Sequence, residues 1–587
     1  MLQRPGYRLD LRDDGTLTLH TADGSQPLLT VAGVPMLPVA GRAVLWGEAT
    51  IEHSPQAVTW RFADNHLWAG ARVTMELADD HVAVSFTGTA LRRTAINKWY
   101  LLKPGSEIHA LECLDFRSHI DSPSAYRTHQ TILGRRKLGT IGLDANTEDS
   151  DLMFAPHPML FVFQHLEDRL VVAPTGLVAG ESLHVKMVKG STIIDDFHVE
   201  VGRDIYWVEA GETVESPRFM FMPDRGGDIY DSLAKYTAIL VREGRIKPKR
   251  QEDLEPWMLS PMWCSWGDQH HILDSAEVIH LAVTKEMRAK AVDNISDAMV
   301  NKVAAVIEQH QLPVRTLIID DRWYTKQGDM FADTRKFPDF RGTIDGLHQR
   351  GFKVLAWSSL YQFDTESEVY KQHPEWFLLH HYHRNPHSPK DIPCLDYSNQ
   401  EIAETYLGEL LTRLLSDKPG CYNLDGIKFD WPFLLPHNYP FADRDWVGKE
   451  KTIHHTQKRI YDIAKRIKPG ALIIGVSPHP FFQDTQDIIR TYDVSTYDIR
   501  IHLERARYVR AIAPGMLPAM DEHVYFQNFF SYLEEGSKLG IPMLYNLIRF
   551  NGDGHVNTPE DYRRMKQMLD AYVARTPALR DYLAKLG

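Results

Sequence analysis

The stretch that decides the fold alternates helical and strand-like patterns: QEIAETYLGELLTRLLSD (400–417), GIKFDW (426–431), HTQKRIYDIAKRIK (455–468) and ALIIGVS (471–477). The two longer segments carry apolar residues at helical spacing, and the two shorter ones are compact apolar runs. Buried strands that alternate with amphipathic helices are typical of βα units and of a parallel sheet.

Six further strand-like runs extend this pattern outward in both directions. They are PMWCSW (261–266), TLIID (316–320), KVLAWS (353–358), TYDVS (491–495), GMLPAM (515–520) and PMLYNLI (542–548). Eight such runs with helices between them predict a TIM-type (β/α)8 barrel. An open, doubly wound sheet is the alternative, but no Gly-rich phosphate loop follows any of the runs.

The first part of the chain has a different pattern, of short runs punctuated by Gly, Asp and Pro. In HVAVSF (81–86), Val82, Val84 and Phe86 share one face, as in a half-buried strand. Many such runs predict a large antiparallel β-sandwich. We therefore expect a sandwich domain over residues 1–245 and a catalytic barrel with C-terminal helices over residues 246–587.

Composition narrows the class of partner. A chain of 587 residues is too long for one core, and its net charge of −12 disfavours nucleic acid and anionic membranes. No apolar run is long enough to span a membrane, and the N-terminal residues resemble no export signal, so a cytoplasmic location is expected. The four cysteines lack CxxC spacing and are expected to be free thiols. A homo-oligomer is left open.

Candidate catalytic residues stand at the ends of the predicted barrel strands, where active sites of this fold lie. Carboxylates end three of the runs, at Asp320-Asp321, Asp430 and Asp493. Lys428 shares a face with Asp430 because strand side chains repeat every second residue, and its charge would favour the ionised carboxylate. A pair of carboxylates about 5–5.5 Å apart is what a retaining glycosidase uses.

Two stretches resemble a known family. LIIDDRWYTKQGDMFADTRKFPDFRGTIDGLHQRGFKVLAW (317–357) and PCLDYSNQEIAETYL with DGIKFDWPF are similar to clan D glycoside hydrolases, the α-galactosidase and raffinose-synthase group. The resemblance implies Asp430 as nucleophile. YDVSTYDIR (492–500) is similar to the family's acid/base segment, and the spacing to Arg500 favours Asp493 over Asp498.

The same resemblance implies that several other residues hold the sugar. Trp263 and His479 are added because each belongs to or follows a predicted strand, although a core position is as compatible with either residue. The family's Asn after the nucleophile is replaced here by Trp431-Pro432-Phe433, which weakens any inference about the sugar. The predicted substrate-binding residues are Asp320, Asp321, Trp357, Lys428, Trp263, His479 and Arg500.

A loop rich in histidine (His380, His381, His383 and His387) raises the question of a metal. Zinc requires ligands that converge in a fixed geometry, and polar loops more often leave such residues solvated. We therefore expect no metal and no cofactor, because a carboxylate pair is sufficient for glycosidic cleavage.

The expected function is a retaining, α-galactosidase-like α-glycoside hydrolase that acts on a neutral oligosaccharide or glycoside by double displacement through a glycosyl-aspartate. Three alternatives remain. A transglycosylase, or an α-glycosidase for another sugar, would use the same residues, whereas a non-catalytic carbohydrate-binding barrel would bind without turnover.

Overall fold

We describe the protein from a computed structural model. It describes residues 1–39, 46–96, 98–102, 105–110, 112–115, 135–137, 142–143, 160–178, 182–186, 198–202, 207–269, 294–381, 391–432, 435, 441–491, 499–521, 526–550 and 554–585.

A closed barrel of eight parallel strands confirms the predicted fold. Its strands, in order around the barrel, are β23 (Met262–Cys264), β24 (Thr316–Ile319), β25 (Lys353–Ser358), β28 (Gly426–Phe429), β29 (Leu472–Gly475), β30 (Ile488–Arg490), β31 (Pro518–Asp521) and β32 (Ile541–Leu544). β32 returns to pair with β23, which closes the ring.

The sixth strand corrects one prediction. It is Ile488–Arg490, which precedes the predicted run, and residues 492–495 of that run lie outside the described residues. All three residues of β30 are buried, including the arginine, and Ile488 and Ile489 supply its apolar faces. A short apolar run that ends in a buried charge has a weak hydrophobic pattern. The prediction therefore placed the sixth strand at TYDVS, a few residues too late.

The interior of the barrel is built in layers, because alternate residues of each strand point inward. The lower layers are apolar and belong to one cluster that includes Met262, Ile318, Leu355, Ile474 and Met543. Intervening residues such as Leu317 and Ile427 point outward into a second cluster shared with the helices.

The helices that cover the barrel begin at recognisable caps. The Asn399 side chain accepts a hydrogen bond from the backbone of Ile402, and Thr558 forms a capping box with Asp561. Short elements join these helices, namely α4 (Ser265–Asp268), α9 (Glu368–Gln372) and the antiparallel pair β26 (Phe377–His381) and β27 (Asp391–Leu395). The longer helices are α7 (Asp297–Gln309), α8 (Phe340–Gln349), α10 (Gln400–Leu415), α11 (Lys449–Ile467), α12 (Ile499–Ile512), α13 (Phe526–Leu539), α14 (Pro559–Ala574) and α15 (Pro577–Leu583).

The N-terminal region consists of antiparallel sheets, as predicted. One five-stranded sheet has the order β1 (Leu2–Gln3), β2 (Tyr7–Leu11), β3 (Leu17–Thr21), β4 (Pro27–Val31), β12 (Glu107–Ile108). A second has the order β15 (Gly142–Leu143), β18 (Ser182–Lys186), β19 (His198–Gly202), β11 (Lys98–Leu101), β5 (Met36–Val39). The ten-stranded sheet runs β14 (Arg135–Lys137), β13 (Glu112–Asp115), β16 (Phe161–His165), β17 (Asp168–Pro174), β22 (Phe219–Arg225), β9 (Val82–Ala90), β8 (Trp68–Leu77), β7 (Ala57–Phe62), β6 (Ala49–His53), with β21 (Thr213–Glu215) also on β9. The short strands β10 (Thr94–Ala95) and β20 (Trp207–Val208) pair with each other.

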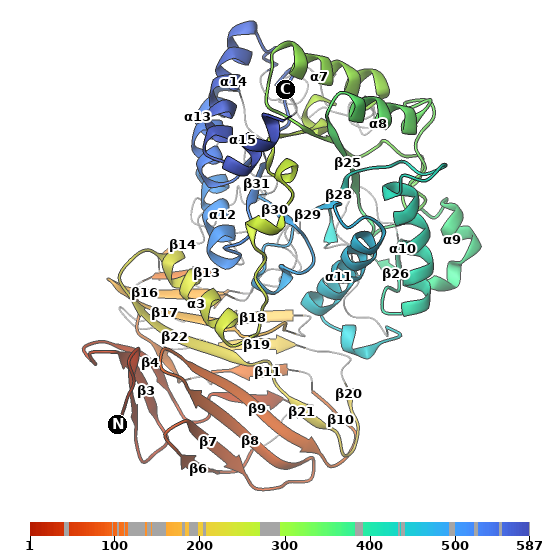
Figure 1. Ribbon diagram of the computed structural model, residues 1–587. Helices are drawn as coiled ribbons and strands as arrows, with labels where there is room; N and C mark the ends of the chain where they lie inside the picture. The colour runs from red at the N-terminus through yellow and green to blue at the C-terminus, as the bar shows by residue number, and fades with distance from the viewer. Residues whose placement is uncertain are drawn as a thin grey trace.

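Helix α3 (Ile229–Arg242) joins the two parts of the molecule. Tyr236 donates a hydrogen bond to the carbonyl of Pro174 in the sandwich, and Tyr230 bonds to Glu504 of α12. Figure 1 shows the sandwich in red to yellow below the barrel in green to blue, with α3 at the junction.

Candidate active site

Ionisable and aromatic side chains replace the apolar layers at the carboxyl ends of the barrel strands. Seven of the eight strands contribute a residue there, from the strand itself or from the next position. They are Cys264, Asp320, Trp357, Lys428, Asp430, Arg490, Asp521 and Tyr545, and all are buried. Five charged groups within one buried layer require mutual pairing, because an unpaired charge away from water is costly.

Asp430 follows β28 and is 7% exposed. Its Oδ2 accepts a hydrogen bond from Trp357 Nε1 at 2.9 Å, and its Oδ1 accepts one from the backbone N–H of Trp431 at 3.2 Å. Arg490 Nη1 lies 3.5 Å from the same Oδ1. Both carboxylate oxygens are therefore oriented by groups that come from three different segments.

The residue after Asp430 has a strained backbone. Trp431 has a φ of 58°, in the left-handed region that favours glycine. This conformation accompanies the hydrogen bond from its N–H back to Asp430. Its ring meets that of Trp357 edge-on, with centroids 5.6 Å apart. Packing and hydrogen bonding at this turn both fix the carboxylate.

Lys428 forms its ion pair with Asp320, and it also attracts Asp430 electrostatically, the direction that the sequence suggested. Its Nζ lies 2.5 Å from Asp320 Oδ2, and Cys264 donates to that same oxygen at 3.0 Å. Burial raises the pKa of Asp320, but the ammonium of Lys428 and these hydrogen bonds outweigh it, so the pKa lies below its usual value. Asp320 is therefore held ionised beside a buried cation.

Asp321 points to another set of partners. Its Oδ1 accepts a hydrogen bond from the Tyr324 hydroxyl at 2.5 Å, and its Oδ2 lies 3.3 Å from Arg322 Nε. Burial raises the pKa of Asp321 despite the nearby Arg322. The Tyr324 ring stacks on Trp357 with an interplanar angle of 7°, so Asp321 borders the aromatic wall beside Asp430.

Two predicted substrate-binding residues lie elsewhere. Trp263 belongs to the outward-facing cluster and donates to Asp268 at 3.0 Å, because its neighbours Met262 and Cys264 take the inward positions. His479 is fully buried, with its Nε2 3.3 Å from Glu450 Oε1. The other oxygen of Glu450 accepts from the backbone of Val178 in the sandwich. His479 therefore contributes to the contact between sandwich and barrel.

The predicted acid/base lies beyond the part of the chain that the structure describes. Asp493 and its competitor Asp498 both fall within residues 492–498. Arg500 is exposed in the first turn of α12. The separation of the Asp430 and Asp493 carboxyl groups stays a prediction.

Four residues of the buried layer were not predicted as site residues from the sequence: Cys264, Arg490, Asp521 and Tyr545. Cys264 was assigned only as a thiol, although it alternates with Met262 on the inward face. Asp521 immediately follows a predicted run, and Tyr545 lies within one. The alternation of inward and outward side chains along each strand could have identified them. For Arg490 this signal was lost because the sixth strand was predicted at the wrong residues.

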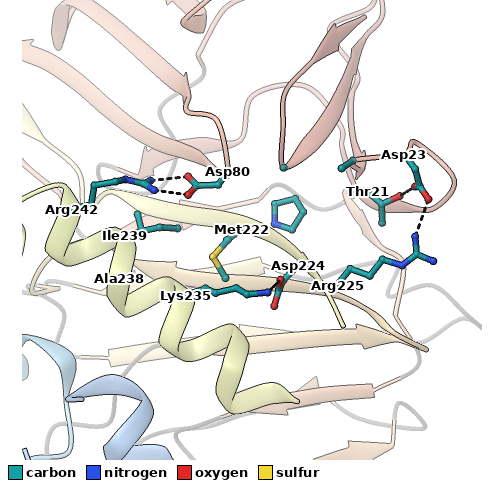
Figure 2. A pocket seen from close by; sticks show the side chains of 13 residues that line it. Thr21, Asp23, Asp80, Met222, Asp224, Arg225, Lys235, Ala238, Ile239 and Arg242 are labelled. Atoms are coloured by element: carbon teal, nitrogen blue, oxygen red, sulfur yellow. Dashed lines mark hydrogen bonds and ion pairs between the residues drawn. The ribbon is translucent and has the colours of Figure 1, made fainter. Parts of the chain in front are cut away.

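A cavity of about 490 Å³ lies away from this layer, between α3 and the sandwich. Figure 2 shows Met222, Ala238 and Ile239 beside it, with ion pairs at its rim. The pairs are Asp80–Arg242, Asp224–Lys235 and Asp23–Arg225. None of its described lining residues is aromatic or belongs to the barrel, so the cavity is separate from the candidate site.

Metal binding has no visible basis in the described ranges. No group of three or more His, Cys, Asp or Glu side chains there is arranged to hold an ion. His383 and His387 lie outside the described residues, as do the side chains of His380 and His381. Among the described helices, none combines the length and the apolar character needed to cross a membrane.

Comparison with known proteins agrees with the barrel. Residues 286–532 match the family model of the glycosyl hydrolases family 31 TIM-barrel domain. An "A type blood alpha-D-galactosamine galactosaminidase" of Flavonifractor plautii is 24% identical over 312 residues, covering 50% of this chain and 26% of that protein. "Alpha-galactosidase 2" of Pediococcus pentosaceus is 30% identical over 181 residues, covering 29% and 24%. The matched part of the chain thus spans about a quarter of these relatives.

Solved structures show the same architecture. The GH36 α-galactosidase AgaA of Geobacillus stearothermophilus, in complex with stachyose, superposes with a TM-score of 0.53 at 13% identity, covering 98% of this chain and 76% of that one. A GH31 sulfoquinovosidase from E. rectale gives a TM-score of 0.59 at 12% identity, covering 96% and 82%. The barrel of this chain therefore resembles glycoside hydrolase barrels: its sequence is similar to the family 31 TIM-barrel domain and to α-galactosidases, and its fold is similar to that of the two solved enzymes.

Proposed function

We propose that this protein is a retaining α-glycoside hydrolase of the α-galactosidase type, with Asp430 as nucleophile and Asp493 as acid/base. The observation that carries the proposal is the setting of Asp430 at the end of β28. Its two oxygens are held by Trp357, Trp431 and Arg490 inside a barrel that resembles those of glycoside hydrolases. A carboxylate fixed in position at the mouth of a barrel suits attack on a bound sugar.

In the first step an oxygen of Asp430 bonds to the anomeric carbon while the glycosidic bond breaks, and Asp493 protonates the leaving oxygen. In the second step water bonds to that carbon, the bond to Asp430 breaks, and Asp493 takes the proton from the water. Asp320, Asp321, Trp357 and Lys428 would hold the sugar beside Asp430.

The charges of the buried layer favour a substrate without negative charge. Asp320, Asp430 and Asp521 outnumber Lys428 and Arg490, and an anionic sugar would face this excess of carboxylates. The α-galactosidase relatives agree with a neutral sugar, and we propose an α-galactoside or a similar neutral α-glycoside as substrate. We further propose that residues 1–245 and 246–587 are the two domains.

The test uses a panel of aryl α-glycosides, with the anomeric configuration of the first product followed by NMR. Retention is expected, whereas inversion would contradict the double displacement. Addition of a sugar acceptor separates hydrolysis from transglycosylation by the products formed. Binding that persists without turnover on any substrate would favour a non-catalytic barrel.

Asp493→Ala and Asp498→Ala then test the acid/base assignment. A glycoside with a good leaving group needs little protonation, so Asp493→Ala should still form the glycosyl-enzyme and should lose its breakdown. The same behaviour in Asp498→Ala alone would move the acid/base role to Asp498.

A further inference from the structure

We propose that Arg490, Asp521 and Tyr545 form a positioning relay that sets the orientation of Asp430 and couples it to the Asp320–Lys428 pair. The inference rests on the proposed function, because it concerns how the nucleophile of that reaction is held. These three residues come from three neighbouring strands, β30, β31 and β32 with the position after it.

Arg490 contacts three different groups with one guanidinium. Nη1 lies 3.5 Å from Asp430 Oδ1, Nε donates to Asp521 Oδ2 at 2.8 Å, and Nη2 donates to the Tyr545 hydroxyl at 3.2 Å. The guanidinium is planar and its donors have a fixed geometry, so two of these contacts determine the direction of the third. Because these contacts are all with protein side chains, one of them the nucleophile itself, we assign Arg490 a positioning role.

Asp521 is the counter-ion that keeps Arg490 in place. The residue is 0% exposed, and its Oδ1 accepts from Tyr545 at 2.9 Å while its Oδ2 accepts from Arg490. Its backbone N–H donates to Thr491 Oγ1 at 3.1 Å, so the strand end itself is anchored. Removal of its charge would leave Asp430 as the nearest carboxylate to Arg490 among the described residues and change the angle of approach.

Tyr545 connects the two buried ion pairs. Its hydroxyl donates to Asp521, accepts from Arg490, and lies 3.4 Å from Lys428 Nζ. Lys428 in turn holds Asp320, one of the proposed sugar-binding carboxylates. The contacts are therefore continuous from the proposed sugar-binding side of the layer to the nucleophile.

This arrangement suits a carboxylate whose charge changes during the reaction. Asp430 is an anion before attack, a neutral ester in the glycosyl-enzyme, and an anion again after hydrolysis. Asp521 balances Arg490 while the ester exists, so no buried cation is left unpaired at that stage. When water releases the sugar, Arg490 is already placed to stabilise the departing carboxylate.

The experiment compares Arg490→Met with Arg169→Met, a buried arginine of the sandwich whose guanidinium binds backbone carbonyls. On aryl α-glycosides we expect Arg490→Met to lower kcat about a hundredfold with KM changed less than about threefold, because the sugar-binding residues stay. Arg169→Met should keep kcat per folded molecule. Asp521→Asn should lower kcat about tenfold or more, and Tyr545→Phe by less.

A crystal structure of Asp521→Asn supplies a readout that needs no activity, since a turned Asp430 carboxylate supports the relay and an unchanged one overturns it. Wild-type kcat in Arg490→Met, or a loss confined to KM, overturns it as well. If Arg490→Met does not fold, circular dichroism shows this and Tyr545→Phe carries the kinetic test, where an unchanged kcat counts against the relay. A wild-type enzyme that turns over none of the glycosides would sink the proposed function instead, and the crystal structure would still decide the relay.

Discussion

Two buried arginines show how differently the sandwich and the barrel use charge. Arg169 in the sandwich donates to the carbonyls of Gly226 and Gly227 and lies near Asp224, so it holds the chain that leads into α3. Arg490 in the barrel instead binds two carboxylates and a tyrosine hydroxyl. Backbone partners are fixed once the chain folds, whereas ionisable partners respond to charge.

The cores around these arginines differ in the same way. The sandwich interior is a continuous apolar cluster with Trp60, Trp68 and Phe86 among its members. The barrel interior is apolar only in its lower layers and becomes a network of charges at the strand ends. Buried charged side chains that bind other ionisable side chains, and not the backbone, are common at functional sites. The comparison teaches that the location of buried ion pairs, more than the size of a cavity, marks the candidate site.

The sharpest way to break this comparison is to remove one carboxylate from each region. Asp430→Ala should lower turnover of every substrate by at least about a thousandfold, because no glycosyl-enzyme can form. Asp224→Ala, which removes the partner of Ser232 and Lys235 in the sandwich, should lower stability and leave kcat unchanged. Steady-state kinetics on folded protein measures both. Azide should partly restore the turnover of Asp430→Ala. Equal losses of kcat in Asp430→Ala and Asp224→Ala would contradict the proposed difference between barrel and sandwich.

The second prediction concerns the energy of the buried pair Asp320–Lys428. Asp320→Asn or Lys428→Met alone should lower the free energy of unfolding by about 3–5 kcal/mol, because each leaves one buried group uncompensated. The double variant should recover much of that stability and none of the activity. Chemical denaturation and kinetics on the same samples separate the two effects. A double variant as unstable as the sum of the single ones would show that the pair is not a unit.

Acidification should affect the barrel more than the sandwich. Burial raises the pKa of the Asp425 and Asp487 carboxyls. The lowering effects, led by His348 on Asp425 and by Lys249 on Asp487, are together larger, so both pKa values lie below the usual 3.8. The pKa of Asp320 is lowered as well. A lowered folded pKa gives stability that is present above the unfolded value and is lost as pH falls through the folded one. Hydrogen exchange by mass spectrometry should therefore show barrel peptides losing protection first below about pH 4.

The sandwich serves as the internal control for that measurement. Among its described carboxyls, Asp23 has its pKa lowered mainly by hydrogen bonds from Thr21 and Ser25. Its side chain is half exposed, so solvent screens these interactions and their loss matters less. Sandwich peptides that lose protection before barrel peptides would reverse the expected order.

The smallest effects are expected from glycine substitutions at two residues with positive φ, one in each region. Leu166 follows β16 in an exposed turn with a φ of 55°, and Trp431 follows the nucleophile with a φ of 58°. Leu166→Gly should raise the free energy of unfolding by up to about 1 kcal/mol, since glycine adopts this conformation without strain. Trp431→Gly relieves similar strain but loses the contact with Trp357, so kcat should fall. Thermal unfolding and kinetics test this, and unchanged kcat in Trp431→Gly would remove its role at Asp430.

Much of the architecture follows from local pattern. The compact runs around Ile318, Leu355 and Ile474 predicted their strands within a few residues, because short apolar segments between amphipathic helices have few other ways to be buried. Asp320, Lys428 and Asp430 were predicted as site residues for the same reason, since they lie at the ends of such runs and alternate with core residues.

The partners of those residues were decided only by closure of the barrel. Arg490, Asp521 and Tyr545 are separated by 31 and 24 residues along the chain, yet their side chains meet because parallel strands bring their carboxyl ends to one layer. In the closed barrel Trp263 points outward and Cys264 inward. Closure also places Lys428 beside Asp320 and Arg490 beside Asp430. Sequence periodicity states which residues share a face of one strand. Which charges face one another depends on the positions of all eight strands, and hence on distances that no local pattern contains.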